Sequence, residues 1–374
     1  MYNKAAIECL RQNLKSCYKS FYENRFFNYV EPLPLNIKFD PTLIFTNCSI
    51  CHFKKLYLED KTIKSYCTIQ PALRTNTYKS IHDTMPIKYT ASLEMLGAFS
   101  IANTKSLVKI LEEHIKYQSQ FLISVLPNDC SITIEISHDL SSLMTEKLKQ
   151  FLKNNKISCT ILTNNLNWDY GMDGIIGLGS NWIIKRNKSE FDFGNVIILF
   201  KDGMPIGVES GGSVELLIQS IFDFPHKIYA NFYCNEWIAN RIKTKKEHMI
   251  EYFDIIDVLA HILWITYSGY ESLKLSVVLE KYIRALKCIM LLKNITFYDL
   301  KLDVKHMEKC YNNWNSQSQQ LYNEITKVLL NTWNISHIMK NHNIKTFQNI
   351  KKYCKGFSKL EKVAILNLNS NVTE

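Results

Sequence analysis

Apolar residues recur at helical or strand spacing along most of the first 225 positions. A helical period predicts helices with one buried face over residues 1–22, 103–118 and 140–153, with Asn103 as the N-cap of the second. Short apolar or alternating runs, which are typical of strands, cover residues 42–45, 67–73, 91–100, 131–136 and 158–162. This mixture predicts a sheet with helices packed against it.

A β-hairpin is a further local signal. Residues 195–200 form an apolar run, Lys201-Asp202-Gly203 is a turn, and residues 205–209 return as a second strand. A helix is expected over residues 213–221, directly after a pair of glycines. Together these elements predict an α+β fold in which helices flank an antiparallel sheet.

The helical period dominates from residue 235 on, where glycine is rare. The expected core of this region consists of Ile255, Val258, Leu259, Ile262, Leu263, Ile265, Val277, Val278, Leu279, Ile283 and Leu286. More helices are expected from Met307, with a frayed end after Asn367. The chain is therefore expected to contain two domains, over residues 1–225 and 226–374.

Composition narrows the class of protein. Hydrophobic residues make up 46% of the 374 residues and charged residues 21%, which excludes a disordered chain. No apolar run is long enough for a membrane span, and the first residues lack a signal-peptide pattern, so we expect a cytoplasmic protein with no membrane partner. The net charge of +10 is compatible with a nucleic-acid partner, although an excess of lysine is often only a solvated surface.

Eleven cysteines are expected to be mostly reduced and buried. Cys48-Ser49-Ile50-Cys51-His52 matches the C-x-x-C-H pattern of haem attachment, and its two cysteines are also spaced like half of a zinc site. No export signal and no second close cysteine pair accompany it. We interpret the pattern as a coincidence of spacing and predict no metal site.

Glycine is concentrated in one part of the chain. Nine of the twelve glycines lie between residues 171 and 212. Tight turns and close approach of a ligand to the backbone both favour glycine. A functional site is therefore predicted near residues 168–213.

Two motifs resemble those of the alanyl-tRNA synthetases. Residues 40–47 (D-P-T-L-I-F-T-N) resemble the family's D-P-T-L-L-F-T-N, and residues 92–100 (S-L-E-M-L-G-A-F-S) resemble F-F-E-M-L-G-N-F-S. The resemblance covers residues 5–290, in the order and spacing of the family. It implies a class II synthetase catalytic domain followed by a helical domain, without the family's editing domain.

The resemblance implies an ATP site. Residues 70–74 resemble Q-R-C-V-R, which assigns the α-phosphate to Arg74 as the catalytic arginine. The implied ATP-binding residues are Arg74, Lys79, Glu94, Gly212 and Glu215, with Mg²⁺ as cofactor. Fixed guanidinium groups and Mg²⁺ would stabilise the negative charge that develops when a carboxylate attacks the α-phosphorus.

The resemblance also implies an amino-acid site. Residues 168–181 resemble W-x-M-G-D-T-G-P-C-G-P-C-S-E, and residues 208–216 resemble V-D-T-G-M-G-L-E-R. The implied amino-acid-binding residues are Trp168, Asn195, Glu209 and Gly211, with Glu209 facing the substrate ammonium. The chain departs from the family at Met172, Asn181 and Leu216, which stand where the family has an aspartate, a glutamate and the arginine that stacks on adenine.

Residues 277–285 faintly resemble Y-V-L-R-R-I-I-R-R, a helix that contacts tRNA in the family. This assigns Lys281 and Arg284 to tRNA binding and suggests the tRNA acceptor stem as a partner. Glu280 replaces an arginine, and the P-S-N-x-x-R-G motif that precedes the helix in the family is missing.

Three functions follow from these observations. The chain could activate alanine or a similar small amino acid with ATP and transfer it to tRNA. It could pass the activated amino acid to a different acceptor in a specialised pathway. Leu216, Met172 and Asn181 instead fit a catalytically inactive relative that binds tRNA or a protein. The amino acid, the acceptor, the use of ATP and the oligomeric state stay open.

Overall fold

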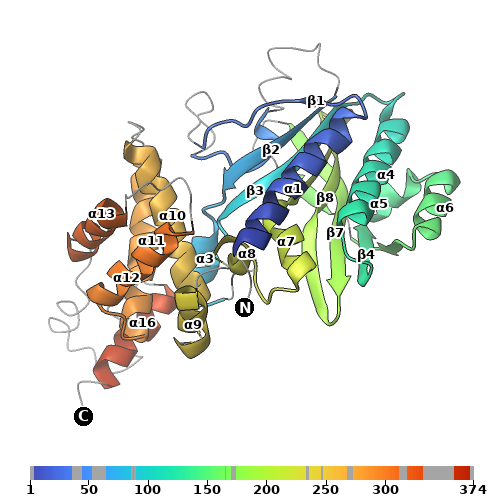
Figure 1. Cartoon of the computed structure of the whole chain (residues 1–374). Coiled ribbons are helices and arrows are strands. Elements are labelled where there is room, and N and C mark those ends of the chain that lie inside the picture. The colour runs from blue at the N-terminus through green and yellow to red at the C-terminus, as the bar shows by residue number, and fades with distance from the viewer. Residues whose placement is uncertain are drawn as a thin grey trace. The chain divides into compact units, whose positions relative to one another are not determined.

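A computed structural model of the chain describes residues 4–35, 44–52, 65–85, 87, 90–164, 166–169, 174–232, 236–245, 247–267, 273–310, 318–331 and 358–370. It divides into two compact units (Figure 1). The first unit contains residues 1–72 and 93–230, and the second contains residues 73–92 and 231–374.

The first unit is built on one central sheet. Its strands are β1 (Asn28–Tyr29), β2 (Ser65–Leu73), β3 (Ser92–Ile101), β4 (Cys130–Ile136), β5 (Ser158–Ile161), β6 (Asn167–Asp169), β7 (Ile175–Arg186), β8 (Ser189–Lys201) and β9 (Met204–Ser213). The order is β1-β2-β3-β9-β8-β7-β4-β5, and β6 pairs with β7. The predicted α+β fold, a sheet flanked by helices, is confirmed.

The strand directions differ in part from the antiparallel expectation. The pairs β3–β9, β9–β8, β8–β7 and β7–β4 are antiparallel, whereas β1–β2 and β4–β5 are parallel. The parallel strands β4 and β5 are joined through helices, because a parallel pair needs a crossover connection. The antiparallel centre of the sheet therefore holds the long strands that carry most of the glycines.

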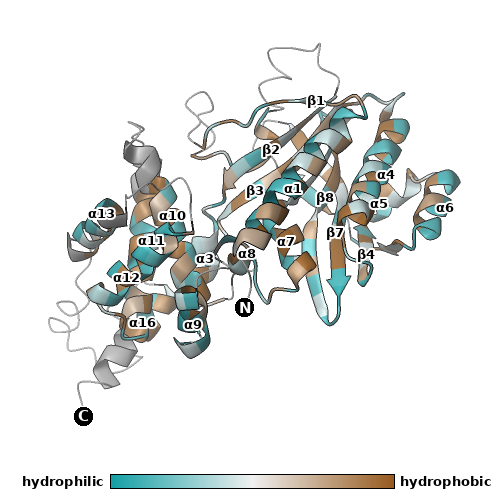
Figure 2. Cartoon of the chain, in the orientation of Figure 1, coloured by the Kyte–Doolittle hydropathy of each residue, from teal (hydrophilic) through white to brown (hydrophobic). Residues whose placement is uncertain are grey.

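Helices cover one face of this sheet (Figure 1). They are α1 (Lys4–Glu23), α4 (Leu107–Val125) and α7 (Val214–Phe222), and α5 (His138–Ser142) and α6 (Glu146–Asn154) follow β4. His114 of α4 is fully buried and bonds the hydroxyl of Ser210 at 3.0 Å and that of Ser100 at 2.9 Å. Burial lowers the pKa of His114 to about 3, so the ring is neutral at physiological pH. Apolar residues run along the strands, while α6 is largely hydrophilic on the side in view (Figure 2).

Residues 44–52 lie over part of the other face of the sheet, where Ser49 lies against Gly97. The strand predicted at 42–45 lies partly outside the described residues, and residues 44 and 45 are not extended in a strand. Ile50 of this segment packs with Tyr66, Phe99, Ile197 and Leu199 in a buried cluster. This cluster is the core beneath the candidate site.

Two local expectations are corrected, and one strand was not predicted. The glycine-rich residues 175–186, to which the sequence pattern assigned no element, form the long strand β7, whose neighbour lies close at Gly179. A Cβ added at Gly179 would stand 2.3 Å from the carbonyl oxygen of Val196. The helix expected over 140–153 is two helices, because Thr145 caps α6 by accepting the N–H of Leu148. The N-cap of α4 is Ser106, not Asn103, whose side chain closes the preceding turn.

The second unit is helical in the part of the chain that the structure describes. It contains α3 (Thr77–His82), α9 (Glu236–Lys245), α10 (Met249–Tyr267), α11 (Leu273–Leu292), α12 (Phe297–Glu308), α13 (Ser318–Asn331) and α16 (Lys359–Ser370), and α8 (Ile228–Phe232) spans the boundary in sequence. Most of the predicted core positions with described side chains are buried, but Val277 is 51% exposed. Leu263 and Ile265 lie outside the described side chains.

A buried aspartate joins three helices of the second unit. Asp303 of α12 is fully buried. It accepts hydrogen bonds from Trp237 Nε1 at 2.6 Å, Arg241 at 2.8 Å and the Tyr252 hydroxyl at 2.9 Å. Burial and then Asp303 raise the pKa of Tyr252 well above its ordinary value, so the phenol stays protonated and donates. The sequence patterns of the three helices do not reveal this network.

Candidate functional site

Residues of four neighbouring strands align in one row across the sheet. Gly97 of β3 pairs with Gly211 of β9, Gly211 with Asn195 of β8, and Asn195 with Asn181 of β7. Asn195 Nδ2 donates to Asn181 Oδ1 at 2.7 Å. Because side chains alternate between faces along a strand, the whole row lies on the face opposite α4, whose His114 bonds Ser210.

One end of this row is covered and the rest is accessible. Ser49 lies so close to Gly97 that an added Cβ would stand 2.1 Å from the Ser49 Cβ. Gly211, Asn195 and Asn181 are half-buried. We call these three residues the polar floor. It is the part of this face where a small ligand can contact backbone and amide groups.

The carboxylate of Glu209 lies beside the polar floor. Glu209 is only 8% exposed, and the hydroxyl of Ser49 donates to its Oε1 at 3.1 Å. The residue shares a face with Gly211, two positions along β9. A buried carboxylate next to a half-buried polar strip suits a cationic group such as a primary ammonium.

Aromatic residues line the same face. Trp168 of β6 is half-buried and packs against the cluster of Ile50, Tyr66 and Phe99 described above. Tyr66 is 2% exposed, and its hydroxyl has no hydrogen-bond partner among the described residues. Burial raises the pKa of Tyr66 well above its ordinary value, and the charge of Glu209 adds to the effect. Tyr66 therefore stays neutral near the carboxylate.

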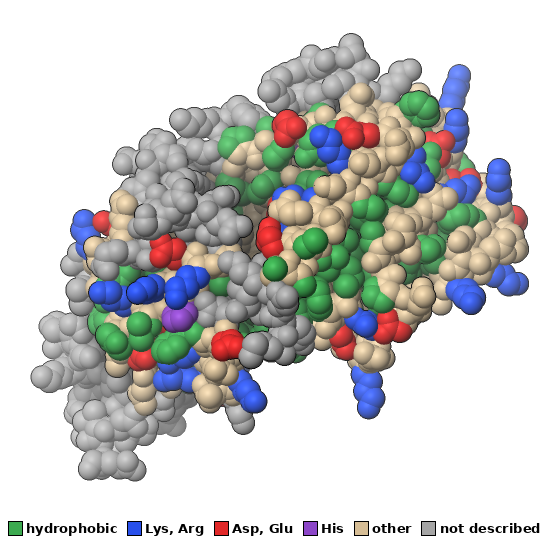
Figure 3. Space-filling view, viewed as in Figure 1, with side chains coloured by type: hydrophobic (Ala, Val, Ile, Leu, Met, Phe, Trp, Pro, Cys, Tyr) green, Lys and Arg blue, Asp and Glu red, His purple; other side chains and the backbone are tan. Residues whose placement is uncertain are grey.

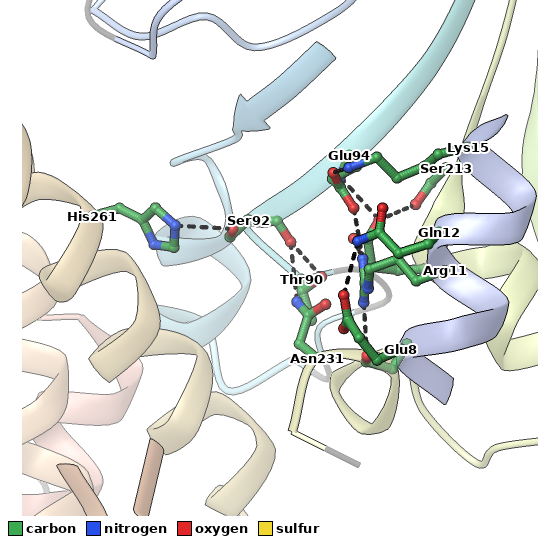
Figure 4. Close-up of polar contacts among 12 residues, drawn as sticks. Glu8, Arg11, Gln12, Lys15, Thr90, Ser92, Glu94, Ser213, Asn231 and His261 are labelled. Carbon is green, nitrogen blue, oxygen red and sulfur yellow. Dashed lines mark hydrogen bonds and ion pairs between the residues drawn. The ribbon is translucent and has the colours of Figure 1, made fainter. Parts of the chain in front are cut away.

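The two glutamates assigned to ATP are bound by Arg11 of α1, which sequence reasoning missed. Figure 4 shows Arg11 and Lys15 of α1 beside Glu94. Arg11 Nη1 lies 2.9 Å from Glu94 Oε2 and 2.7 Å from Glu215 Oε1, and Lys15 also pairs with Glu94. Glu215 additionally accepts the Glu94 N–H at 3.0 Å and the Ser213 hydroxyl at 2.8 Å. We call Arg11, Lys15, Glu94 and Glu215 the glutamate clasp.

Electrostatics of the clasp keep Arg11 and Glu94 charged. Burial alone would lower the pKa of Arg11, but Glu215 and Glu94 raise it above its ordinary value. Burial would likewise raise the pKa of Glu94, whereas Arg11 and Lys15 lower it. Arg11 and Lys15 stand four residues apart on one face of α1, which is the only sequence signal of the clasp.

Gly212 and Leu216 also lie away from the polar floor. Gly212 belongs to the opposite face of β9, where an added Cβ would stand 2.2 Å from the Phe193 ring. Leu216 is 7% exposed on α7. Met172 and Asp173 lie outside the described residues. The structure thus brings together Trp168, Asn195, Glu209 and Gly211 on one face.

The other residues singled out from the sequence belong to the second unit. The N–H of Arg74 donates to the carbonyl of Ala91 at 2.7 Å, and Lys79 lies in α3. Lys281 Nζ stands 4.4 Å from the centre of the Tyr78 ring. Arg284 pairs with Glu280 at 2.6 Å and Glu361 at 4.0 Å. Both cations assigned to tRNA are therefore already engaged by neighbours.

The described residues contain neither a metal-type cluster nor a helix suited to span a membrane. Among the described residues, no group of three or more His, Cys, Asp or Glu side chains converges as it would around a metal ion. No described helix has both the length and the hydrophobicity that a membrane span needs.

Solved structures with partial likeness to this chain are class II aminoacyl-tRNA synthetases. A threonyl-tRNA synthetase from Aeropyrum pernix is 9% identical, with a TM-score of 0.40 over 57% of this chain and 59% of that one. The histidyl-tRNA synthetase of S. aureus is 9% identical, with a TM-score of 0.41 over 56% and 65%. Asparaginyl-tRNA synthetase from Pyrococcus horikoshii, complexed with asparaginyl-adenylate, is 11% identical, with a TM-score of 0.38 over 61% and 67%.

The chain spans less than two thirds of the length of the first two of these structures. No protein-family model matches the sequence, and no curated protein matches it either. At such identities and TM-scores the likeness concerns part of the fold alone.

Proposed function

We propose that the chain is an alanyl-tRNA synthetase-like ligase, which activates alanine or a similarly small amino acid with ATP and transfers it to tRNA. The observation that supports this proposal is the buried carboxylate of Glu209 beside the polar floor. Glu209 and Gly211 stand in the chain's counterpart of the V-D-T-G motif, and Trp168 opens the resembling residues 168–181.

Each residue of this face has a role in the proposal. Glu209 binds the substrate ammonium, and the Ser49 hydroxyl holds its Oε1 in place. Asn195 and Asn181 hold each other through their amides and offer their remaining polar atoms to the substrate. Trp168 borders the substrate side chain, and Gly211 leaves room for the substrate backbone. A pocket of this kind favours a small amino acid.

The proposed reaction is attack by the amino-acid carboxylate on the α-phosphorus of ATP. A bond forms between the carboxylate oxygen and phosphorus, and pyrophosphate leaves, which yields the aminoacyl-adenylate. By resemblance, Arg74 neutralises the charge that develops on the α-phosphate and Lys79 contacts a phosphate. A hydroxyl of the acceptor then attacks the activated acyl carbon, and AMP leaves.

Mg²⁺ does not fit the glutamates that the resemblance offers. Hard cations of this kind bind open carboxylate oxygens together with substrate phosphates. Glu94 and Glu215 are both paired with Arg11, and Glu215 is 2% exposed. Neither carboxylate is open to a metal ion, so no step of the proposed reaction is assigned to Mg²⁺.

Glu209→Gln tests the role of the carboxylate. We expect kcat/KM for the amino acid in ATP–pyrophosphate exchange to fall roughly 30- to 1,000-fold, because loss of a buried charge pair costs about 2–4 kcal/mol. Glu135→Gln is the matched control: it lies on the same face, opposite Asn181, but is half-exposed. Equal activity of Glu209→Gln and Glu135→Gln would show that Glu209 does not bind the substrate ammonium.

A catalytically inactive relative is the second candidate. It is favoured by Leu216, which stands in place of an adenine-stacking arginine and is buried, and by the pairing of both glutamates with Arg11. A guanidinium stacks on an adenine ring as a cation, whereas leucine cannot. Exchange activity separates the ligase from this candidate, and transfer of label to tRNA separates tRNA from other acceptors.

A row of lysines on α12 supports an RNA partner. Lys301, Lys305 and Lys309 are exposed at four-residue spacing, and Tyr298, 70% exposed, continues the same face. Basic side chains gather over α12 in the space-filling view (Figure 3). Lysines neutralise phosphates, and an exposed ring can stack on a base.

Reversing the three charges with Lys301→Glu, Lys305→Glu and Lys309→Glu is expected to weaken tRNA binding. The slope of log K against log salt should become shallower by about 2–3, because each lost phosphate contact removes roughly 0.7–0.9. Fluorescence anisotropy with labelled tRNA measures this slope. The same triple reversal at Lys147, Lys149 and Lys153, exposed on α6, is the control. Similar losses in both variants would show that only net charge matters.

A further inference from the structure

Two cysteines flank the residues that cover the candidate site. Cys48 Sγ and Cys51 Sγ lie 3.8 Å apart. The N–H of Cys51 approaches the carbonyl of Cys48 at 3.5 Å and that of His52 approaches Ser49 at 3.4 Å, so residues 48–51 form a turn. Such a turn brings its first and fourth Cα atoms within about 7 Å, and disulfides span roughly 4.4–6.8 Å between Cα atoms.

A neighbouring side chain holds the two thiols side by side. Asn47 Oδ1 accepts a hydrogen bond from Cys48 Sγ at 3.0 Å and from Cys51 Sγ at 3.7 Å. One acceptor shared by two thiols keeps both sulfurs on the same side of the turn. A shift of about 1.8 Å would then bring them to the bonded distance of about 2.05 Å.

We propose that Cys48 and Cys51 are a redox site at which a small-molecule disulfide forms a reversible intramolecular disulfide. The Cys48 thiolate attacks one sulfur of the reagent, and one thiol leaves. The Cys51 thiolate then attacks Cys48 Sγ, and the second thiol leaves. The protein loses two protons and two electrons, and the disulfide reagent is reduced to two thiols.

The exposure of the two cysteines sets the order of these steps. Cys48 is half-buried, whereas Cys51 is 2% exposed. An external disulfide therefore reaches Cys48 first, and Cys51 is the resolving thiol. This order predicts a transient adduct on Cys48 and none on Cys51.

Oxidation would act on the candidate site through the two residues between the cysteines. Ser49 bonds Glu209 and lies against Gly97, and Ile50 packs in the cluster that borders Trp168. Drawing the sulfurs together changes the turn that holds both side chains. This consequence, unlike the disulfide itself, rests on the proposed function: the oxidised protein should have a KM for the amino acid raised about tenfold, the effect of one lost hydrogen bond.

Mass spectrometry of the full chain tests the disulfide. The protein is incubated with oxidised glutathione, and its mass and peptides are compared with those of the protein kept in dithiothreitol. We expect the loss of two hydrogens and a peptide linked between Cys48 and Cys51, both reversed by dithiothreitol. Two intact thiols at these positions, or stable glutathione adducts in place of the link, would overturn the proposal.

Variants assign the reaction to individual sulfurs. Cys51→Ala should accumulate a glutathione adduct on Cys48, and Cys48→Ser should leave Cys51 unmodified. Cys9→Ser, an exposed cysteine of α1, is the control and should form the 48–51 link like the wild type. The wild-type mass result stands even if a variant fails to fold.

Exchange activity of the reduced and oxidised protein tests the coupling. Activity that falls on oxidation and returns with dithiothreitol supports it, and equal activity in both states overturns it. If neither the reduced nor the oxidised protein shows exchange activity, the proposed function is contradicted. The linked peptide still decides whether the redox site exists.

Discussion

Arg11→Met is expected to lower the free energy of unfolding of the first unit by about 3–5 kcal/mol, because breaking a buried ion pair leaves an uncompensated charge. Methionine keeps an unbranched apolar side chain at this position but removes both bonds to Glu94 and Glu215. Glu215 is 2% exposed and cannot be rehydrated in place. The effect is measured by urea unfolding of the purified protein.

Neighbouring variants separate the clasp from general damage to α1. Gln12→Met changes an adjacent, exposed residue and should cost less than about 0.5 kcal/mol. Adding Glu215→Gln to Arg11→Met should restore part of the lost stability, since it removes the uncompensated charge. If Arg11→Met costs no more than Gln12→Met, the clasp does not stabilise the fold.

The clasp also makes stability depend on pH in a defined direction. Arg11 and Lys15 lower the pKa of Glu94 below its ordinary value of 4.5, against the effect of burial. A carboxylate with a lowered folded pKa contributes stability that is complete above its unfolded pKa and is lost as pH falls through the folded value. The stability of the wild type should therefore fall below about pH 4.5, and that of Arg11→Met should fall less steeply over the same range.

Asp303→Ala is expected to destabilise the second unit by about 3–5 kcal/mol. The substitution removes the acceptor of three donors at once. It leaves the fully buried Tyr252 hydroxyl without its acceptor, and Arg241, whose side chain is 12% exposed, keeps only the longer 3.5 Å pairing with Asp299 among the ion pairs of the described residues. A buried donor without its partner loses its hydration as well as its bond. Thermal and urea unfolding followed by circular dichroism measure the loss.

An ion pair of the same length provides the control. Arg186 and Asp129 also approach to 2.8 Å, but the Asp129 side chain is 52% exposed. Asp129→Ala should cost at most about 1 kcal/mol, as exposed pairs do. If Asp303→Ala and Asp129→Ala lose equal stability, burial of Asp303 does not make its removal more costly than that of an exposed aspartate.

Local pattern predicts the elements of this protein better than their arrangement. The helices α1 and α4, the strands β2 to β5 and the β8–β9 hairpin follow from apolar spacing, although every residue of β5 is exposed. β7 does not follow from it, since Gly177 and Gly179 break the alternation. At Gly179 the neighbouring strand lies too close for a side chain, because an added Cβ would stand 2.3 Å from the Val196 carbonyl oxygen. The split between α5 and α6 depends on one threonine cap.

Some residues of the candidate site could be singled out from the sequence, but their arrangement could not be predicted. Resemblance alone singled out Glu209, Gly211, Asn195 and Trp168, and their common face emerges only from the register of β6 to β9. The pairing of Arg11 with Glu94 and Glu215 spans 83 and 204 positions of sequence, so no local pattern predicts it. Ser49 likewise reaches Glu209 across 160 positions.

The most direct test of the proposed ligase is amino-acid-dependent exchange of labelled pyrophosphate into ATP by the wild-type protein, without tRNA and with each amino acid in turn. The proposal predicts exchange with alanine or another small amino acid, and much less with large ones. If no amino acid supports exchange while tRNA still binds, the chain is not an amino-acid-activating enzyme.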